Sequence, residues 1–245
     1  MKSLHNVPAP AKLNLFLHIT GRQSDGYHLL QSVFMLVDWC DTLHFDVRDD
    51  GRITREDLTT PLPAEDLTVK AARALQAFSG THLGVDIQIN KSIPAEAGMG
   101  GGSSDAASCL LALNRLWNLQ LSRADLMQIG LKLGADVPFF LCGTNAWVEG
   151  IGEQIQAIDI PSAQFLVLKP AAGLSTQAIF SHRELKRDTE TAIISGFLAH
   201  PFDFGRNDLQ AVAQKLCPDV NLALIWLKNK GLQPRMTGSG SAVFA

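Results

Sequence analysis

The most informative segment of the sequence is Pro94-Ala95-Glu96-Ala97-Gly98-Met99-Gly100-Gly101-Gly102-Ser103-Ser104. Four of the five residues from Gly98 to Gly102 are glycine, which has no Cβ and lets the backbone take positive φ and approach a bulky anion closely. A turn of this kind directs successive N–H groups into one concavity that suits phosphate oxygens. The helical pattern that follows would place the positive end of its dipole at the same point. This segment, the glycine loop, therefore predicts a phosphate-binding site.

The glycine loop differs from two common nucleotide-binding motifs. It is not a Walker A loop, because no Gly-Lys-Ser/Thr follows the glycines, and it is not GxGxxG, because Ser103 occupies the place of the third glycine. Ser103 and Ser104 add hydroxyl groups that can bind phosphate or Mg²⁺. A flexible surface turn is the simplest alternative, but a strand, a glycine run, a serine pair and a helix in this order are hard to explain as a linker.

The rest of the chain mixes strand and helix patterns. Alternating apolar and polar residues predict strands at 11–19 and 85–89, and further strands are predicted at 32–38, 42–47 and 165–168. Helices are predicted at 67–78, at 104–117, from a capping box at Ser122 to about Gly134, and at 207–226 with a break near Pro218. The polar stretch 49–63 is expected to form turns and loop, and a glycine-rich turn near the C-terminus leads into an apolar strand. This mixture predicts an α/β or α+β class.

The composition is that of an ordinary globular protein and gives no sign of nucleic acid or a membrane as partner. The chain has 245 residues, 46% hydrophobic and 18% charged, with a formal net charge of −3. No apolar run approaches the ~18 residues of a membrane span, and Pro8, Pro10 and Lys12 interrupt any signal-peptide core. The four cysteines lack metal-site spacing, so we expect free thiols, no structural zinc and a cytoplasmic location. The oligomeric state stays open.

The glycine loop resembles the ATP-binding signature of the GHMP kinases, roughly Pro-x-x-x-Gly-Leu-Gly-Gly/Ser-Gly/Ser-Ser-Ser-x-x-Ala. Two more segments agree: Pro10–Leu15 is similar to the N-terminal signature of the diphosphocytidyl-methylerythritol kinases, and Thr237–Ala245 is similar to the third GHMP motif. The segments Gly26–His28 and Gly134–Pro138 fit the same subfamily. The resemblance runs from about residue 8 to the last residue, and the motifs are specific when taken together.

This resemblance implies a mixed α+β, two-lobed GHMP kinase fold with a cleft between the lobes. The expected lobes are an N-terminal ATP-binding lobe at 1–157 and a C-terminal lobe at 158–245. Family members normally continue for a few tens of residues past the third motif, so we expect the second lobe to be incomplete at its C-terminal end. ATP would bind on the glycine loop, and a cytidyl substrate would enter from the side of Tyr27.

Two residues are candidates for catalysis, Asp136 and Lys12. Asp136 follows a helix end, and a loop carboxylate there can orient or deprotonate an alcohol, although aspartate after Gly-Ala is often just a turn residue. Lys12 lies in a predicted strand, where lysine normally faces solvent. The resemblance implies that Asp136 is the catalytic aspartate and that Lys12 lies beside it and stabilises developing charge. The implied reaction is direct in-line transfer from Mg·ATP to the 2-hydroxyl of the erythritol unit.

The resemblance assigns ATP binding to the glycine loop, residues 94–104, and to two residues outside it. Lys91 is a possible adenosine contact, and Asp66 stands where the family usually has asparagine, which puts an adenine contact at this position in question because an ionised aspartate cannot donate. Ser104 is the candidate Mg²⁺ ligand. Glu96 and Met99 depart from the common pattern, Met99 by a volume-conserving change and Glu96 by a charge expected to face solvent.

Five residues are candidates for binding the substrate. The resemblance implies that Tyr27, the only tyrosine, stacks on the cytosine ring, that His28 hydrogen-bonds its edge, and that Phe180 covers the other face. Thr176 resembles a nearby polar contact, and Asn14 is expected to hold the erythritol or phosphate end. Without the resemblance, the Tyr-His pair would be read as a surface anchor and Phe180 as a core residue.

Two other functions stay open on the sequence. Another GHMP kinase would phosphorylate homoserine, mevalonate or a sugar, but Tyr27, His28 and the segment Pro10–Leu15 match the cytidyl-binding subfamily. A non-catalytic nucleotide-binding module would bind ATP without transferring phosphate, and retention of both Lys12 and Asp136 argues against it.

Overall fold

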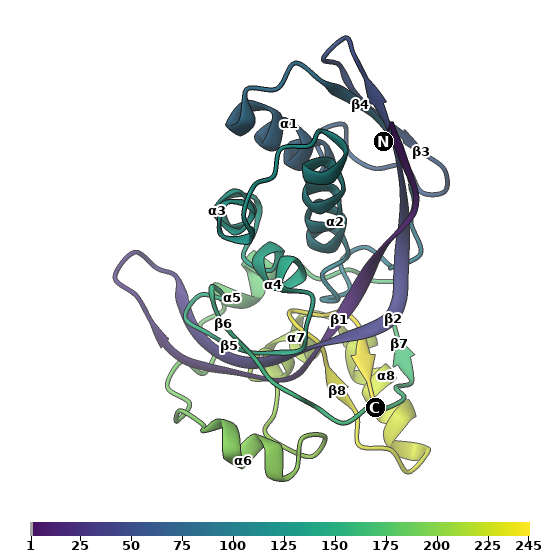
Figure 1. Ribbon diagram of the computed structural model, residues 1–245. Coiled ribbons are helices and arrows are strands. Elements are labelled where there is room, and N and C mark those ends of the chain that lie inside the picture. The colour runs from purple at the N-terminus through teal and green to yellow at the C-terminus, as the bar shows by residue number, and fades with distance from the viewer. Residues whose placement is uncertain (1) are drawn as a thin grey trace. The chain divides into compact units, whose positions relative to one another are not determined.

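The computed structural model describes residues 2–245 and divides the chain into two compact units, each built from several segments (Figure 1). Unit 1 consists of the N-terminal residues up to Ala11, Val37–Ile93 and Gly100–Gly143. Unit 2 consists of Lys12–Leu36, Pro94–Met99 and Thr144–Ala245. The predicted lobes 1–157 and 158–245 are continuous in sequence, whereas these units are not, and the lobe boundary stays a prediction.

Two long strands pass through both units. β1 (Ser3–Arg22) pairs with β2 (His28–Arg48), and in unit 1 β2 also pairs antiparallel with β4 (Gly84–Asn90). The predicted strands at 11–19 and 85–89 are confirmed, while those at 32–38 and 42–47 are parts of the single strand β2.

The edge strand β3 (Ile53–Asp57) pairs parallel with β4 and lies inside the stretch predicted as loop, so that prediction was wrong. Its sequence is short and mostly polar, which gives no clear strand signal. Ion pairs stabilise it instead. The Arg55 guanidinium lies 2.7 Å from the Asp57 carboxylate and 2.6 Å from that of Asp66.

Four helices complete unit 1, and they pack on one another (Figure 1). They are α1 (Leu67–Ser79), α2 (Gly101–Leu116), α3 (Arg123–Leu133) and α4 (Val137–Cys142). The predicted capping box is present, because the Ser122 side chain accepts from the Asp125 backbone and the Asp125 side chain accepts from that of Ser122. α1 and α2 follow the predicted helices within a few residues, so the helical periodicity was read correctly.

Unit 2 contains the other half of the first sheet and a small second sheet. Residues 32–34 of β2 pair with β5 (Ala146–Glu149), which pairs with β6 (Gln154–Ala157). The second sheet has the order β7 (Val167–Leu168), β9 (Val243–Phe244) and β8 (Arg235–Met236). The predicted strand at 165–168 is confirmed for its last two residues, and the predicted strand after the C-terminal glycine turn is confirmed.

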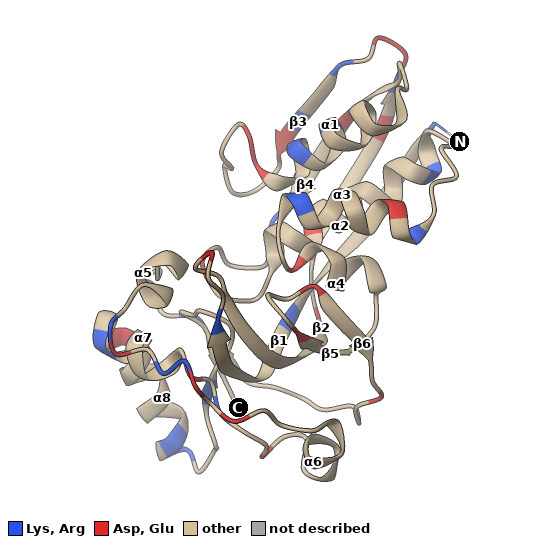
Figure 2. Ribbon diagram, turned by 90° about the vertical axis from the view of Figure 1, so that its left-hand side faces the viewer, with Lys and Arg blue, Asp and Glu red and all other residues tan. Residues whose placement is uncertain are grey.

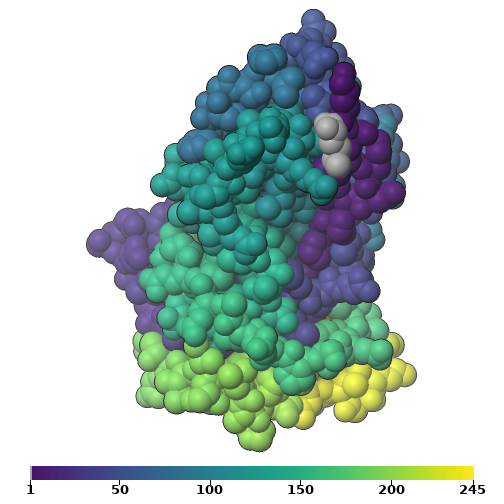
Figure 3. Space-filling model, viewed as in Figure 1, coloured from purple at the N-terminus to yellow at the C-terminus, as the bar shows by residue number. Residues whose placement is uncertain are grey.

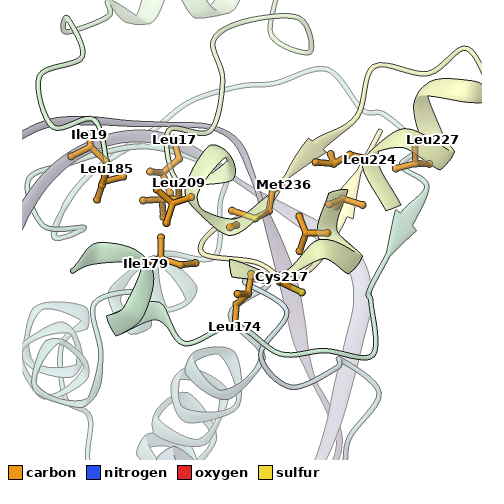
Figure 4. Close-up of a cluster of buried hydrophobic side chains, with 14 residues drawn as sticks. Leu17, Ile19, Leu174, Ile179, Leu185, Leu209, Cys217, Leu224, Leu227 and Met236 are labelled. Atoms are coloured by element: carbon orange, nitrogen blue, oxygen red, sulfur yellow. The ribbon is translucent and has the colours of Figure 1, made fainter. Parts of the chain in front are cut away.

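The helices of unit 2 are α5 (Thr176–Phe180), α6 (Ile194–Ala199), α7 (Gln210–Leu216) and α8 (Pro218–Asn229). Side chains of α5, α7 and α8 pack into a hydrophobic core of this unit. α8 begins at Pro218, the predicted break, because proline suits the first turn of a helix and not its interior. Figure 4 shows the core, in which Leu17 of β1 lies among side chains such as Ile179 of α5 and Leu209, the residue before α7.

Charged residues of both signs occur in both units. Figure 2 shows basic and acidic residues interspersed in both units. In Figure 3 the C-terminal residues (yellow) share one surface of unit 2 with residues near 200 (light green). Among residues 2–245, no helix has both the length and the apolar character needed to cross a bilayer. All four cysteines are free thiols, as predicted.

Candidate active site

Lys12 is buried in β1, with 3% of its surface exposed, although a strand lysine normally faces solvent. Its Nζ donates a hydrogen bond to Asn14 Oδ1 at 2.5 Å and lies 4.6 Å from the centre of the Phe34 ring. Lys12 and Asn14 share one face of the strand because successive strand side chains alternate. Asn14 Nδ2 donates to Ser32 Oγ of β2 at 2.9 Å, so both functional groups of the Asn14 amide are engaged. The cation is therefore held in a fixed place, with its stem desolvated.

The C-terminal motif contacts this part of β1 directly. The Asn14 backbone N–H donates to Thr237 Oγ1 at 2.9 Å, and Thr237 Oγ1 lies 3.4 Å from Gly98 O of the glycine loop. The Lys12 N–H donates to Met99 O at 2.9 Å. Three segments far apart in the sequence thus meet in unit 2 through backbone groups and the Thr237 hydroxyl.

The approach of the C-terminal motif explains one glycine in the loop. Gly98 has φ of +71°, and a Cβ built on it would overlap the carbonyl oxygen of Thr237 and lie 2.9 Å from Gly240 N. A side chain would therefore be both strained and blocked. In the same loop, the Ser241 N–H donates to Glu96 O at 2.9 Å, while the Glu96 side chain is exposed, as expected for its charge.

In unit 1 the glycine loop continues into the N-terminus of α2. Gly100 is the N-cap, with φ of +74°, and no side chain caps the helix. The first N–H groups of a helix have no partner within it, so those of residues 101–103 are available to an anion. Ser103 is partly exposed, and its hydroxyl lies 3.7 Å from where a Cβ on Gly134 would be. Ser104 is fully buried, and its hydroxyl has no hydrogen-bond partner among the described residues.

Asp136 is in the same unit, at the N-cap of α4. Its backbone has helical angles, its side chain makes no capping hydrogen bond to its own helix, and the residue is partly exposed. Gly134, two residues earlier, lies against Ser103, and α2 packs on α4. The Asp136 turn and the helix end of the glycine loop are therefore neighbours within unit 1.

Lys91 does not point to solvent but lies between two buried carboxylates. Its Nζ contacts Asp41, and it donates to Asp105 Oδ2 at 2.6 Å. Asp41 Oδ1 also accepts from the backbone N–H groups of Ser92 at 2.6 Å and Ile93 at 2.8 Å. Asp41 therefore stabilises the segment that leads into the glycine loop. Sequence reasoning missed Asp41, because nothing local distinguishes it from other strand aspartates.

The two carboxylates of this triad differ in their environment. Asp41 accepts from two backbone N–H groups and contacts the Lys91 ammonium. Burial, and then the charge of Asp41 and a hydrogen bond to it, outweigh Lys91 and raise the pKa of Asp105 to about 7. The second oxygen of Asp105 is buried with no hydrogen-bond partner among the described residues.

Asp66 stabilises the start of α1. It is the N-cap, its carboxylate accepts from the Val69 N–H at 3.0 Å, and it pairs with Arg55. An aspartate can make both contacts, which accounts for its presence where asparagine is usual in the family. An adenine contact from Asp66 stays a prediction.

The predicted base-binding residues cluster in unit 2. The rings of His28 and Phe180 are 5.1 Å apart at 44°, and Tyr27, the residue before His28, is 62% exposed. The Thr176 hydroxyl lies 2.7 Å from that of Ser239, which links α5 to the C-terminal motif. Sequence reasoning missed Arg187, whose Nε donates to His28 Nε2 at 2.9 Å, because it lies in an irregular segment without a motif.

Known proteins are similar to this chain over its full length. Residues 66–144 match the model of the GHMP kinases N-terminal domain. The 4-diphosphocytidyl-2-C-methyl-D-erythritol kinase of Albidiferax ferrireducens is 71% identical over 245 residues, covering 100% of this chain and 85% of that protein. The kinase of the same name from Polaromonas naphthalenivorans is 66% identical, covering 100% and 86%.

Solved structures of kinases are also similar to this chain. A crystal structure of 4-(cytidine 5'-diphospho)-2C-methyl-D-erythritol kinase is similar with a TM-score of 0.82 at 33% identity, covering 97% of this chain and 88% of that one. Mevalonate kinase of Methanococcus jannaschii shares the fold, with a TM-score of 0.67 at 14% identity, covering 99% and 89%. The chain is a small-molecule kinase and belongs to the 4-diphosphocytidyl-2-C-methyl-D-erythritol kinase family of GHMP kinases.

Proposed function

We propose that this kinase transfers the γ-phosphoryl group of ATP to the 2-hydroxyl of 4-diphosphocytidyl-2-C-methyl-D-erythritol, giving the 2-phosphate and ADP in isoprenoid precursor biosynthesis. The names of relatives at 62–71% identity over the whole chain support the substrate. The observation that carries the proposal is the buried network in which Lys12, Asn14 and Thr237 are joined to the glycine loop. A buried lysine with its partners fixed is the arrangement expected of a group that stabilises transferred charge.

The nucleotide phosphates would bind at the glycine loop. The N-terminus of α2 offers N–H groups that no side chain caps, together with the positive end of a 16-residue helix. Gly98 and Gly100 both have positive φ, a backbone conformation that glycine adopts without strain. The ammonium of Lys91 is already held by the carboxylates of Asp41 and Asp105. Lys91 would therefore support nucleotide binding indirectly, by holding Asp41, which in turn binds the segment before the glycine loop.

Mg²⁺ would be bound mainly by the nucleotide. Among residues 2–245 no group of three or more His, Cys, Asp or Glu side chains could hold a metal, and Mg²⁺ at phosphate sites commonly uses few protein ligands. The buried, unpartnered hydroxyl of Ser104 fits an oxygen ligand, but only a shift of the loop would expose it, whereas Ser103 is already partly exposed. When bound, Mg²⁺ neutralises charge on the β- and γ-phosphates.

Catalysis would rest on Asp136 and Lys12. We assign Asp136 to orienting the acceptor hydroxyl and accepting its proton, and Lys12 to stabilising charge on the transferred group. No covalent intermediate on the enzyme is needed, because positioning and electrostatics supply most of the acceleration in phosphoryl transfer.

The cytidyl end of the substrate would bind in unit 2. Tyr27 and Phe180 would stack on the base from two sides, His28 would hydrogen-bond its edge, and Thr176 and Asn14 would contact the remainder. The high exposure of Tyr27 supports this assignment, since a tyrosine with a purely structural role is normally more buried.

The free cysteines support a cytoplasmic location, where thiols stay reduced. The proposed partner is a small molecule, and the proposed reaction needs neither nucleic acid nor a membrane.

The test is release of ADP from Mg·ATP with and without 4-diphosphocytidyl-2-C-methyl-D-erythritol. We expect release that depends on this acceptor and that is absent with mevalonate or homoserine. Release with one of those acceptors instead would identify another GHMP kinase. Saturable ATP binding with no transfer to any acceptor would support a nucleotide-binding module.

A further inference from the structure

Arg187 forms hydrogen bonds both with His28 and with the segment that carries Phe180. Its Nε donates to His28 Nε2 at 2.9 Å. Its other guanidinium nitrogens donate to backbone carbonyls at 2.9–3.1 Å, those of Phe180, His182 and Leu185. The rings of His28 and Phe180 are therefore held 5.1 Å apart by one side chain that contacts both segments.

The contact with Arg187 determines which nitrogen of His28 carries the proton. A guanidinium has only donors, so the nitrogen that faces it must be the acceptor. In a neutral imidazole the other nitrogen, Nδ1, then carries the hydrogen. Burial, and then the charges of Arg187 and Arg22, lower the pKa of His28, which favours this neutral form. Within residues 2–245 no side chain or backbone group forms a hydrogen bond with Nδ1.

We propose that Arg187 is a positioning residue that fixes His28 as the Nδ1–H tautomer, so that this site presents a hydrogen-bond donor to the base. The inference rests on the proposed function, because it concerns how the cytidyl group is selected. On its Watson–Crick edge, cytosine offers acceptors at N3 and O2, whereas uracil carries a hydrogen on N3. A fixed donor therefore favours cytosine and leaves two donors facing each other with uracil.

Arginine suits this role better than lysine would. Its planar fork makes several hydrogen bonds in fixed directions, while an ammonium on a flexible stem would not hold three carbonyls and an imidazole together. The same fork also limits the position of Phe180, since two of the four hydrogen bonds go to the Phe180 and His182 carbonyls. Selection of the base and placement of its stacking partner thus depend on one residue.

The first test needs no substrate. Nitrogen-15 NMR of the histidine side chains, with the His28 signals assigned by their loss in His28→Asn, reports which ring nitrogen is protonated. We expect Nδ1–H in the wild type and a mixture of both tautomers in Arg187→Met. Lys186→Met is the matched control, because it removes a neighbouring exposed charge without touching His28. An Nε2–H tautomer in the wild type, or no change in Arg187→Met, would overturn the proposal.

The second test measures kcat and KM with the cytidine substrate and with its uridine counterpart. We expect Arg187→Met to raise the cytidine KM with kcat retained, and to reduce the preference for cytidine by about tenfold, near the upper end for one net hydrogen bond. A merely structural loss would raise both KM values equally and leave the preference unchanged. If Arg187→Met does not fold, Arg187→Lys is used, with a smaller loss of preference expected. Absence of wild-type turnover would contradict the proposed function, while the NMR result would still decide the role of Arg187.

Discussion

The hydroxyl of Thr237 accepts a hydrogen bond from the backbone N–H of Asn14 at 2.9 Å, across 223 positions of sequence. Both residues are buried, so the Thr237→Val variant, which keeps the shape of the side chain, would leave the Asn14 N–H without a partner. An unsatisfied buried donor costs about 1–3 kcal/mol. For a chain of this size we expect thermal unfolding to show Tm lower by roughly 2–4 °C per kcal/mol.

Thr237→Ser is the control for this prediction, because it keeps the hydroxyl and removes only a methyl group. We expect Thr237→Ser to retain most of the stability that Thr237→Val loses. Equal losses in the two variants would mean that packing of the methyl group, and not the hydrogen bond, joins the C-terminal motif to β1.

Gly98 and Gly143 form a matched pair, since both have φ of +71°. Nothing lies within 4 Å of a Cβ on Gly143, whereas a Cβ on Gly98 would overlap the Thr237 carbonyl. Gly143→Ala should cost only the left-handed strain of about 1–2 kcal/mol. Gly98→Ala should cost a further ~1–3 kcal/mol of overpacking and should also weaken ATP binding. The measurements are urea unfolding and nucleotide titration. Equal effects of the two substitutions would show that the Thr237 carbonyl places no steric demand on Gly98 beyond its left-handed turn.

Much of the fold could be predicted from the sequence where periodicity is strong. Val85, Ile87 and Ile89 alternate cleanly and are all buried in β4, and α1 ends within one residue of its predicted bound. β3 could not be predicted, because a short polar edge strand depends on pairing with β4 and on the ion pairs of Arg55. Its structure is determined by neighbours distant in sequence.

The site residues likewise fall into those with a local sequence signal and those that only the fold identifies. The glycine loop carries a local signal, since its conformation needs glycine at particular positions such as Gly98. Asp41 and Arg187 act only through partners brought near by the fold, on Lys91 and His28 respectively, and no local pattern identifies them. The burial of Lys12 was unexpected from its strand alone, because both faces of that part of β1 are covered.

Removal of either proposed catalytic group should reduce turnover. We expect Asp136→Asn and Lys12→Met each to lower kcat by at least ~100-fold, the low end for a positioned acid–base group. Both changes keep the approximate volume of the side chain, so circular dichroism serves as the check that each variant is folded. Turnover near that of the wild type in a folded variant would remove that residue from the mechanism.

Tyr27→Ala should affect binding and not stability. Tyr27 is 62% exposed, so its loss should change the free energy of unfolding by less than about 0.5 kcal/mol. Stacking on a base is worth on the order of 1–3 kcal/mol, which corresponds to a rise of about 5- to 150-fold in the KM of the cytidyl substrate. Tyr27→Phe keeps the ring and should keep the KM. An unchanged KM in Tyr27→Ala would exclude stacking by this residue.

Asp105 makes the stability of unit 1 depend on pH. Its carboxyl has a pKa raised to about 7, chiefly by burial, so between its ordinary pKa and pH 7 the folded state holds a proton that the unfolded state has lost. Stability from this group is therefore complete below about pH 4 and decreases as pH rises toward 7. The Asp105→Asn variant lacks this titration while keeping an oxygen that can accept from Lys91.

We therefore expect the wild type to lose stability relative to Asp105→Asn between pH 5 and pH 8, by on the order of 1–3 kcal/mol. Urea unfolding at one-unit intervals of pH measures this difference. Asp49→Asn makes the same chemical change at an exposed position of unit 1 and controls for general charge effects. Parallel curves for the wild type and Asp105→Asn would show that Asp105 is ionised throughout this range, with Lys91 balancing both carboxylates beneath the glycine loop.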